Sequence, residues 1–174
     1  MVERTIKSES IFRGRVFSVE VDEIDCGGRI AEREVVRHSG GVAVLALEDD
    51  GRVVMVRQFR YALGRELLEL PAGKLEEKEN PMAAAVRELE EETGYIASAV
   101  EPLGQIVPTG GYNSEVLYLF LATGLIAGES HPDEGEFLSV ELVPFDKALA
   151  MVLDGRIEDA KTAVGLMKYE LLHR

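Results

Sequence analysis

The stretch from Gly73 to Tyr95 reads GKLEEKENPMAAAVRELEEETGY, and it constrains the structure of this chain more than any other segment. Its second half predicts a helix over 81–93, because Asn80 suits the N-cap and Pro81 suits the first helical position. Gly94 follows the last helical residue and readily takes the left-handed conformation that ends many helices. We therefore expect a short helix with both ends fixed by sequence.

The side chains of this helix fall into two groups. The apolar group has the spacing of a stripe expected to face the core, and it consists of Met82, Val86 and Leu89. The acidic group shares another face, and it consists of Glu88, Glu91 and Glu92. Three carboxylates repel one another, whereas a hard divalent cation such as Mg²⁺ would bind them through oxygen. Acidic runs are commonly solvated faces, so the spacing alone leaves both interpretations open.

The fixed positions of the whole stretch favour the metal interpretation. Gly73 is followed by Glu79, then by Arg87 with the three glutamates, and then by Gly94. This pattern resembles the box of Nudix hydrolases at every fixed position. The resemblance implies an α/β fold of Nudix type, an α/β/α sandwich with a mixed sheet, in which the box forms a loop–helix–loop at the edge. It also implies hydrolysis with Mg²⁺ as the cofactor and Mn²⁺ as a substitute.

The resemblance assigns roles inside the box. It implies that the three glutamates bind the metal together with the backbone carbonyl of Ala72. Glu79 and Arg87 match the outer fixed positions, and we expect them to form an ion pair that braces the loop against the helix. Gly73 and Gly94 are expected to be structural.

Composition narrows the partners and the location. The net charge of −13 disfavours nucleic acid, whose binding needs a basic surface. No apolar run approaches the roughly 20 residues of a membrane helix, and the first ten residues lack the apolar core of a signal peptide. With the single cysteine, Cys26, no internal disulfide forms. A cytoplasmic protein is expected. An enzyme acting on phosphate esters would also need local positive charge, for which Arg57, Arg60 and Arg65 are candidates.

Alternating residues ahead of the box predict strands. Residues 15–25 and 30–38 favour a hairpin with a turn at 26–29. We expect 1–38 to form a small antiparallel β segment with little core of its own, one that packs on a partner subunit, and 39–174 to form the Nudix domain. Within that domain the patterns predict strands or extended segments at 42–47, 52–59, 66–76, 100–107, 116–123 and 137–143, and helices at 145–154 and 159–172.

Over residues 15–172 the chain resembles the ADP-ribose pyrophosphatase branch of the family. The segment VRQFRYALGRELLELPAGKLE is similar to the region before the box, and DGRIEDAKT is similar to the linker into the last helix. The resemblance implies a homodimer that exchanges its N-terminal segment. It implies these substrate-binding residues: Arg33, Glu34, Arg60, Glu69 and Glu115.

A general base is missing from the box. The loop 129–136 offers Glu129, Asp133, Glu134 and Glu136, and such a loop alone is commonly just solvated. The DExE pattern resembles the mobile loop of the same branch, whose first glutamate is the base. This implies Glu134 as the base, with Glu136 as the alternative, and a loop that closes on substrate.

One departure leaves the substrate open. The branch carries proline in the loop after the box, where this chain reads Thr109-Gly110-Gly111. ADP-ribose, cleaved to AMP and ribose 5-phosphate, is the leading substrate. Another nucleoside diphosphate sugar, such as a GDP-hexose, is the alternative. A non-catalytic sensor of ADP-ribose is less favoured, because all the metal carboxylates are present.

Overall fold

The computed structural model describes residues 2–132, 135 and 137–173. The chain divides into two compact units. The N-terminal unit comprises residues 1–40 and 107–116, and the main unit comprises 41–106 and 117–174. The predicted base candidates Glu134 and Glu136 lie outside the described residues, as does Asp133. None of the described helices is long and apolar enough to cross a membrane.

In the described part of the N-terminal unit, three antiparallel strands form a sheet in the order β1–β2–β3. The strands are β1 (Arg4–Arg13), β2 (Phe17–Asp25) and β3 (Ile30–His38). The predicted hairpin joins β2 to β3, and Cys26 N donates to Arg29 O at 2.8 Å in its turn. The segment 107–116 runs along β3, where Val36 N donates to Tyr112 O and Ser114 N donates to Val36 O.

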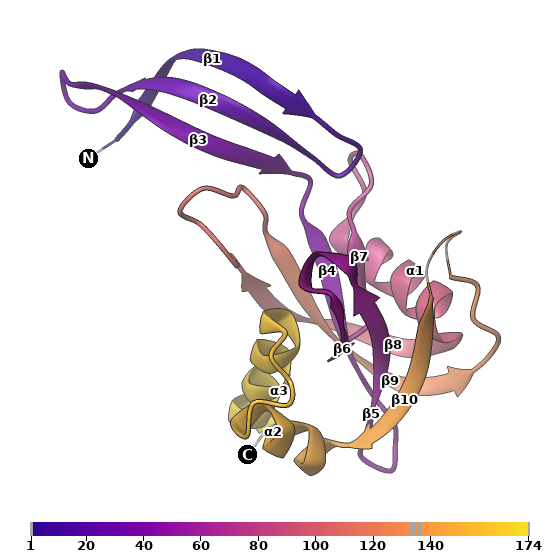
Figure 1. Cartoon of the computed structure of the whole chain (residues 1–174). Helices are drawn as coiled ribbons and strands as arrows, with labels where there is room; N and C mark the ends of the chain where they lie inside the picture. The colour runs from indigo at the N-terminus through magenta and orange to yellow at the C-terminus, as the bar shows by residue number, and fades with distance from the viewer. Residues whose placement is uncertain (1, 133–134, 136, 174) are drawn as a thin grey trace. The chain divides into compact units, whose positions relative to one another are not determined.

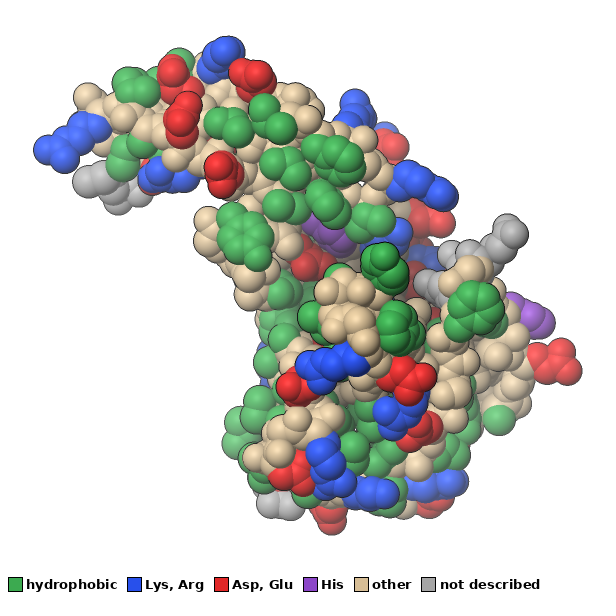
Figure 2. Space-filling view, in the orientation of Figure 1, with side chains coloured by type: hydrophobic (Ala, Val, Ile, Leu, Met, Phe, Trp, Pro, Cys, Tyr) green, Lys and Arg blue, Asp and Glu red, His purple; other side chains and the backbone are tan. Residues whose placement is uncertain are grey.

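Strand β1 was not predicted as a separate element. All ten of its residues are exposed. Hydrophobic side chains gather over the visible face of β1–β3 (Figure 2). Among the exposed apolar residues of these strands are Ile6, Ile11, Phe12, Phe17 and Ile30.

The described part of the main unit contains a seven-stranded mixed sheet. Only the pair β4–β9 is parallel among its described pairings. In sheet order the main strands are β10 (Leu138–Pro144), β5 (Arg52–Arg60), β4 (Gly41–Leu47), β9 (Leu117–Ala127) and β8 (Tyr95–Ile106). Two short strands join at the side, β6 (Arg65–Glu69) on β5 and β7 (Ala72–Lys74) on β4, and a 3₁₀ turn, η1 (Tyr61–Leu63), precedes β6.

Helices cover both faces of this sheet (Figure 1). Helix α1 (Pro81–Thr93) packs on one face, and α2 (Phe145–Leu153) and α3 (Ala160–His173) pack on the other. Strand β4 shows why: Val42 and Val44 belong to the core with α1, whereas Ala43 and Leu45 belong to the core with α2 and α3. Burial on both faces explains the unbroken apolar run of this strand. The α/β/α sandwich predicted from the sequence is confirmed.

The predicted apolar stripe of α1 is wrong at two of its three positions. Met82 and Val86 are 41% and 39% exposed, and only Leu89 is buried. The helix instead faces the sheet with Ala84 and Ala85, both fully buried. The buried face of the helix therefore includes Ala84, Ala85 and Leu89, and Met82 and Val86 lie outside it.

Candidate active site

Both ends of α1 are fixed as the sequence predicts. At the start, Asn80 Oδ1 accepts hydrogen bonds from Met82 N at 2.9 Å and Ala83 N at 3.3 Å. At the end, Gly94 has φ 75° and its N–H donates to Glu90 O. A Cβ on Gly94 would lie 2.7 Å from Gly128 O, so both conformation and space require glycine here. The glutamates therefore project from a helix whose register is set at each end.

Two of these glutamates contact strand β7. Glu92 is buried, and its Oε2 accepts a hydrogen bond from Ala72 N at 2.9 Å. The carboxyl group of Glu88 lies on the α-carbon of Gly73, where a Cβ would be 1.9 Å from Glu88 Cδ. Any side chain at position 73 would therefore displace Glu88. The box glycine creates the space that one predicted metal ligand occupies.

Arg87 joins the remaining charges of the box. Its Nη1 donates to Glu88 Oε1 and to Glu91 Oε2, both at 2.8 Å. Its Nε and Nη2 donate to the two carboxylate oxygens of Glu79 at 3.0 and 3.1 Å. The predicted contact between Arg87 and Glu79 is thus present, and the same guanidinium also offsets the repulsion between the helix carboxylates.

The hydrogen bonds from Arg87 lower the pKa of Glu79, and the backbone N–H of Glu76 adds to this effect. Conversely, the pKa of Arg87 is raised, chiefly by its hydrogen bond to Glu79. Both groups therefore stay charged at neutral pH, and the loop is held to the helix by an ion pair.

The donor set fits a divalent cation in its chemistry. Hard carboxylates are the ligands that such cations prefer, and Glu88 and Glu92 are both anchored at Ala72–Gly73. Among the described residues, however, no three Asp, Glu, His or Cys side chains converge as a ready metal cage. Glu88 and Glu91 face Arg87 instead.

A second charged cluster surrounds Glu69, the last residue of β6. The side chain of Glu69 is buried, with 1% of its surface exposed. Arg60 donates two hydrogen bonds to the Glu69 carboxylate, from Nε to Oε1 and from Nη2 to Oε2, each 2.7 Å long. Lys161 Nζ also donates to Oε2 of Glu69, and it pairs with Asp159 Oδ1 at 3.0 Å. Burial acts to raise the pKa of Glu69, but the hydrogen bond from Arg60 and the charge of Lys161 lower it overall. The buried carboxyl is therefore ionised.

Arg60, in the cluster around Glu69, also interacts electrostatically with a carboxylate of helix α1. The pKa of Arg60 is raised, first by its hydrogen bond to Glu69 and in smaller part by the charges of Asp159 and Glu92. The negative charge of Glu92 on helix α1 therefore acts on Arg60, which is bound to Glu69. A cation in this position is suited to an anionic ligand beside the box.

Hydrogen bonds tie the segment before β7 to helix α3. Leu70 N donates to Thr162 Oγ1 at 2.8 Å, and Thr162 Oγ1 donates to Asp159 Oδ2 at 2.6 Å. Thr162 N also donates to Asp159 Oδ2 at 3.0 Å. The sequence did not identify Asp159, Lys161 or Thr162 as site residues. Its only signal was the similarity of DGRIEDAKT to the branch.

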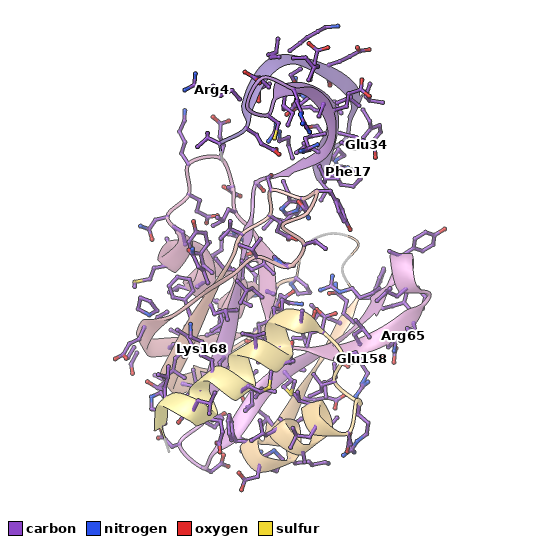
Figure 3. All side chains as sticks on the ribbon, turned by 90° about the vertical axis from the view of Figure 1, so that its left-hand side faces the viewer. Arg4, Phe17, Glu34, Arg65, Glu158 and Lys168 are labelled. Carbon is purple, nitrogen blue, oxygen red and sulfur yellow. The ribbon has the colours of Figure 1, made fainter. Side chains whose placement is uncertain are left out.

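The other candidate arginines of the main unit are engaged elsewhere. Arg57 Nε donates to Glu141 Oε1 at 2.5 Å. Arg65 pairs with Glu158 on the surface, and Figure 3 shows these two side chains beside each other. Of the three arginines proposed to supply positive charge, Arg60 is the one that reaches the charged cluster around Glu69.

Three of the predicted substrate-binding residues lie in the N-terminal unit. Arg33 donates from Nη2 to Glu3 Oε1 at 2.5 Å, and Glu34 is exposed on β3 (Figure 3). Glu115 Oε1 lies 3.7 Å from His38 Nδ1, and Asn113 Oδ1 accepts a hydrogen bond from Glu115 N. These residues are part of a different unit from the box, and their binding role stays a prediction.

The loop that carries the base candidates follows β9, and its described start contacts the last turn of α1. His131 N donates to Glu91 O at 2.8 Å. Glu129, one of the four candidates, is exposed. The described start of the loop is thus hydrogen-bonded to the helix that carries the predicted metal ligands.

Comparison with known proteins gives consistent results. The model of the NUDIX domain matches residues 37–163. A Bacillus subtilis protein named ADP-ribose pyrophosphatase is 41% identical over 172 residues, which cover 97% of this chain and 93% of the relative. A Mycobacterium tuberculosis protein of the same name is 38% identical over 168 residues, covering 94% and 81%. A Bacillus methanolicus protein named methanol dehydrogenase activator is 41% identical over 172 residues, covering 97% and 93%.

A solved structure, described as the crystal structure of an ADP compounds hydrolase, superimposes with a TM-score of 0.85. The match covers 99% of this chain and 94% of the other, at 22% identity, so it establishes the fold. The domain match spans most of the sequence, and the relatives align over nearly its whole length. In the box, Glu88 lies against Gly73 and Glu92 accepts a hydrogen bond from Ala72 N. The chain therefore belongs to the Nudix family of hydrolases.

Proposed function

We propose that the protein hydrolyses the pyrophosphate bond of ADP-ribose to AMP and ribose 5-phosphate, with Mg²⁺ as cofactor and Mn²⁺ as a substitute. The observation that carries this proposal is the anchoring of Glu88 and Glu92 at Ala72–Gly73, beside Glu91 and Arg87. The relatives named ADP-ribose pyrophosphatase support the substrate.

Glu88, Glu91, Glu92 and the carbonyl of Ala72 would hold the metal. A bound divalent cation neutralises the charge of the pyrophosphate and lowers the pKa of an attacking water. Arg87 keeps the carboxylates in place through its hydrogen bonds to Glu88 and Glu91. Because this site is made from one helix and one short strand, its geometry does not depend on a long loop.

Glu134 is the general base in this proposal, with Glu136 as the alternative. The support is the DExE pattern and the hydrogen bond from His131 N to Glu91 O, which ties the start of that loop to α1. A base must reach the attacking water directly or through one more water. Arg60 is proposed to bind the diphosphate, and Arg33, Glu34, Glu69 and Glu115 are the other proposed substrate-binding residues.

The second candidate substrate is a GDP-hexose. A Yersinia pestis protein named GDP-mannose pyrophosphatase is 38% identical over 157 residues, covering 81% of this chain and 75% of the relative. Gly110, at the position where the ADP-ribose branch usually carries proline, leaves the substrate open to this alternative. The third candidate is a regulatory protein that binds ADP-ribose without cleaving it, and the relative named methanol dehydrogenase activator supports the regulatory part of this candidate.

A substrate panel separates these functions. The purified protein is assayed with Mg²⁺ against ADP-ribose, GDP-mannose and UDP-glucose, and the products are identified by chromatography. We expect the highest kcat/KM for ADP-ribose, with AMP and ribose 5-phosphate in equal amounts and no turnover in EDTA. A higher kcat/KM for GDP-mannose would establish the alternative. Binding of ADP-ribose without release of AMP would establish the regulatory role.

A further inference from the structure

Glu69 has two cationic partners that differ in their exposure. The side chain of Lys161 is 9% exposed, whereas that of Arg60 is 39% exposed. Lys161 is also held by Asp159, and it lies in the first turn of α3. Arg60 lies at the end of β5, just before η1. Lys161 is therefore a fixed partner of Glu69, and Arg60 is the one with access to solvent.

This difference decides what Arg60 is able to do. A buried carboxylate that loses its only cation is strongly destabilised, because the charge is left uncompensated in a medium that solvates it poorly. If Arg60 were the sole partner of Glu69, it could not leave for a ligand without that penalty. With Lys161 on Oε2, Glu69 keeps one cation when Arg60 leaves.

We propose that Lys161 is a positioning residue. Its ammonium group compensates the negative charge of Glu69, so that Arg60 is able to leave Glu69 and bind the diphosphate oxygens of the substrate. Arg60 suits this transfer, since its planar fork binds a carboxylate or a phosphate with two parallel hydrogen bonds. The inference rests on the proposed function, in which Arg60 binds the substrate.

The distinction from a merely structural role lies in the charge of Glu69. If Lys161 acts by compensating that charge, then removing the charge makes Lys161 dispensable for substrate binding. If Lys161 only packs α3 onto β6, its loss is equally harmful whether residue 69 is charged or neutral. A double-mutant cycle between positions 69 and 161 measures this difference.

The test compares the wild type with Lys161→Met, Glu69→Gln and the double variant, by kcat and KM for ADP-ribose at saturating Mg²⁺. We expect Lys161→Met to raise KM about tenfold with a smaller change in kcat, because Glu69 then retains Arg60. We expect Glu69→Gln and the double variant to have the same KM, whatever change the loss of the Glu69 charge itself causes, because Lys161 then has no charge at position 69 to compensate. Glu158→Gln is the matched control, since Glu158 lies in the same linker and pairs only at the surface with Arg65.

The outcomes are distinct. An unchanged KM in Lys161→Met overturns the inference while leaving hydrolysis of ADP-ribose in place. If Lys161→Met raises KM to the same extent in the Glu69→Gln background as in the wild type, the inference is also overturned. If Lys161→Met does not fold, the pair Glu69→Gln and Glu69→Gln/Lys161→Met decides, because a higher KM in the double variant contradicts the inference. If the wild type does not turn over ADP-ribose, the proposed function fails, and this inference fails with it.

Discussion

The carboxyl group of Glu88 lies against the α-carbon of Gly73, in the space that a Cβ would fill. This contact joins the first fixed position of the box to the first glutamate of its helix. It gives a physical reason for glycine at position 73 that does not involve a special backbone angle. The absence of a side chain at Gly73 leaves space for the carboxylate of Glu88, a predicted metal ligand.

The first prediction follows from this contact. Gly73→Ala should push Glu88 out of its place and weaken Mg²⁺ binding or activity by about 10- to 100-fold, the range seen when groups that orient metal ligands are changed. Magnesium titration of the hydrolysis rate measures the loss, and circular dichroism tests that the fold is kept. A wild-type magnesium dependence in this variant would contradict the seating of Glu88 by Gly73.

The second prediction concerns Glu92. Glutamine at this position keeps an oxygen that accepts the hydrogen bond from Ala72 N, so the fold should persist while the metal loses a charged ligand. We expect kcat to fall by at least about 100-fold, because a metal ligand supports several kcal/mol of transition-state stabilisation. Glu90→Gln, exposed on the same helix, is the control and should retain activity. Equal rates for the Glu92 variant and the wild type would remove Glu92 from the metal site.

The third prediction is a pH dependence of stability. The folded-state pKa of Glu79 is lowered below its ordinary value of 4.5, chiefly by its hydrogen bond with Arg87. A lowered pKa stabilises the fold above the unfolded pKa, and this stabilisation is lost as pH falls through the folded value. Glu79→Gln should therefore be less stable than the wild type at pH 7, and the difference should shrink as the pH falls below about 4.5.

Urea unfolding of both proteins between pH 7 and pH 3.5 measures this difference. The control is Glu77→Gln, since Glu77 is an exposed residue of the same loop whose ion partner is the adjacent Lys78. A difference between wild type and the Glu79 variant that stays constant over this range would contradict the ion pair as its source.

The parts of the site that the sequence predicts are local. Asn80 and Gly94 set the ends of α1 within the segment itself, and the spacing of the glutamates then places them on one face. The failure at Met82 and Val86 has a tertiary cause, because the helix packs on the sheet with the face that carries Ala84 and Ala85. Small side chains such as alanine carry little hydrophobic signal, so periodicity alone did not identify the face that packs.

The charged cluster around Glu69 was beyond such local reasoning. Glu69 and Lys161 are 92 positions apart, and only the packing of α3 brings them together. Strand β1 was missed for a related reason. Its residues are all exposed, so no core imposes the alternation by which strands are recognised.

The last prediction is a homodimer formed through the N-terminal unit. Strand β1 is a ten-residue edge strand with every residue exposed, and its apolar side chains include Ile11 and Phe12. Long exposed edges of this kind tend to pair or pack with another chain. Light scattering at micromolar concentration should give twice the chain mass of 19.1 kDa. Ile11→Asp combined with Phe12→Asp should give the monomer.

Leu153→Asp is the matched control for this experiment, since Leu153 is an exposed apolar residue of α2 in the main unit. It should leave the dimer intact. If Arg33 and Glu34 contribute to the partner's substrate site, the monomeric variant should also show a raised KM for ADP-ribose, whereas the Leu153 variant should not. A monomeric wild type with full activity would contradict both the dimer and the exchange of this segment between subunits.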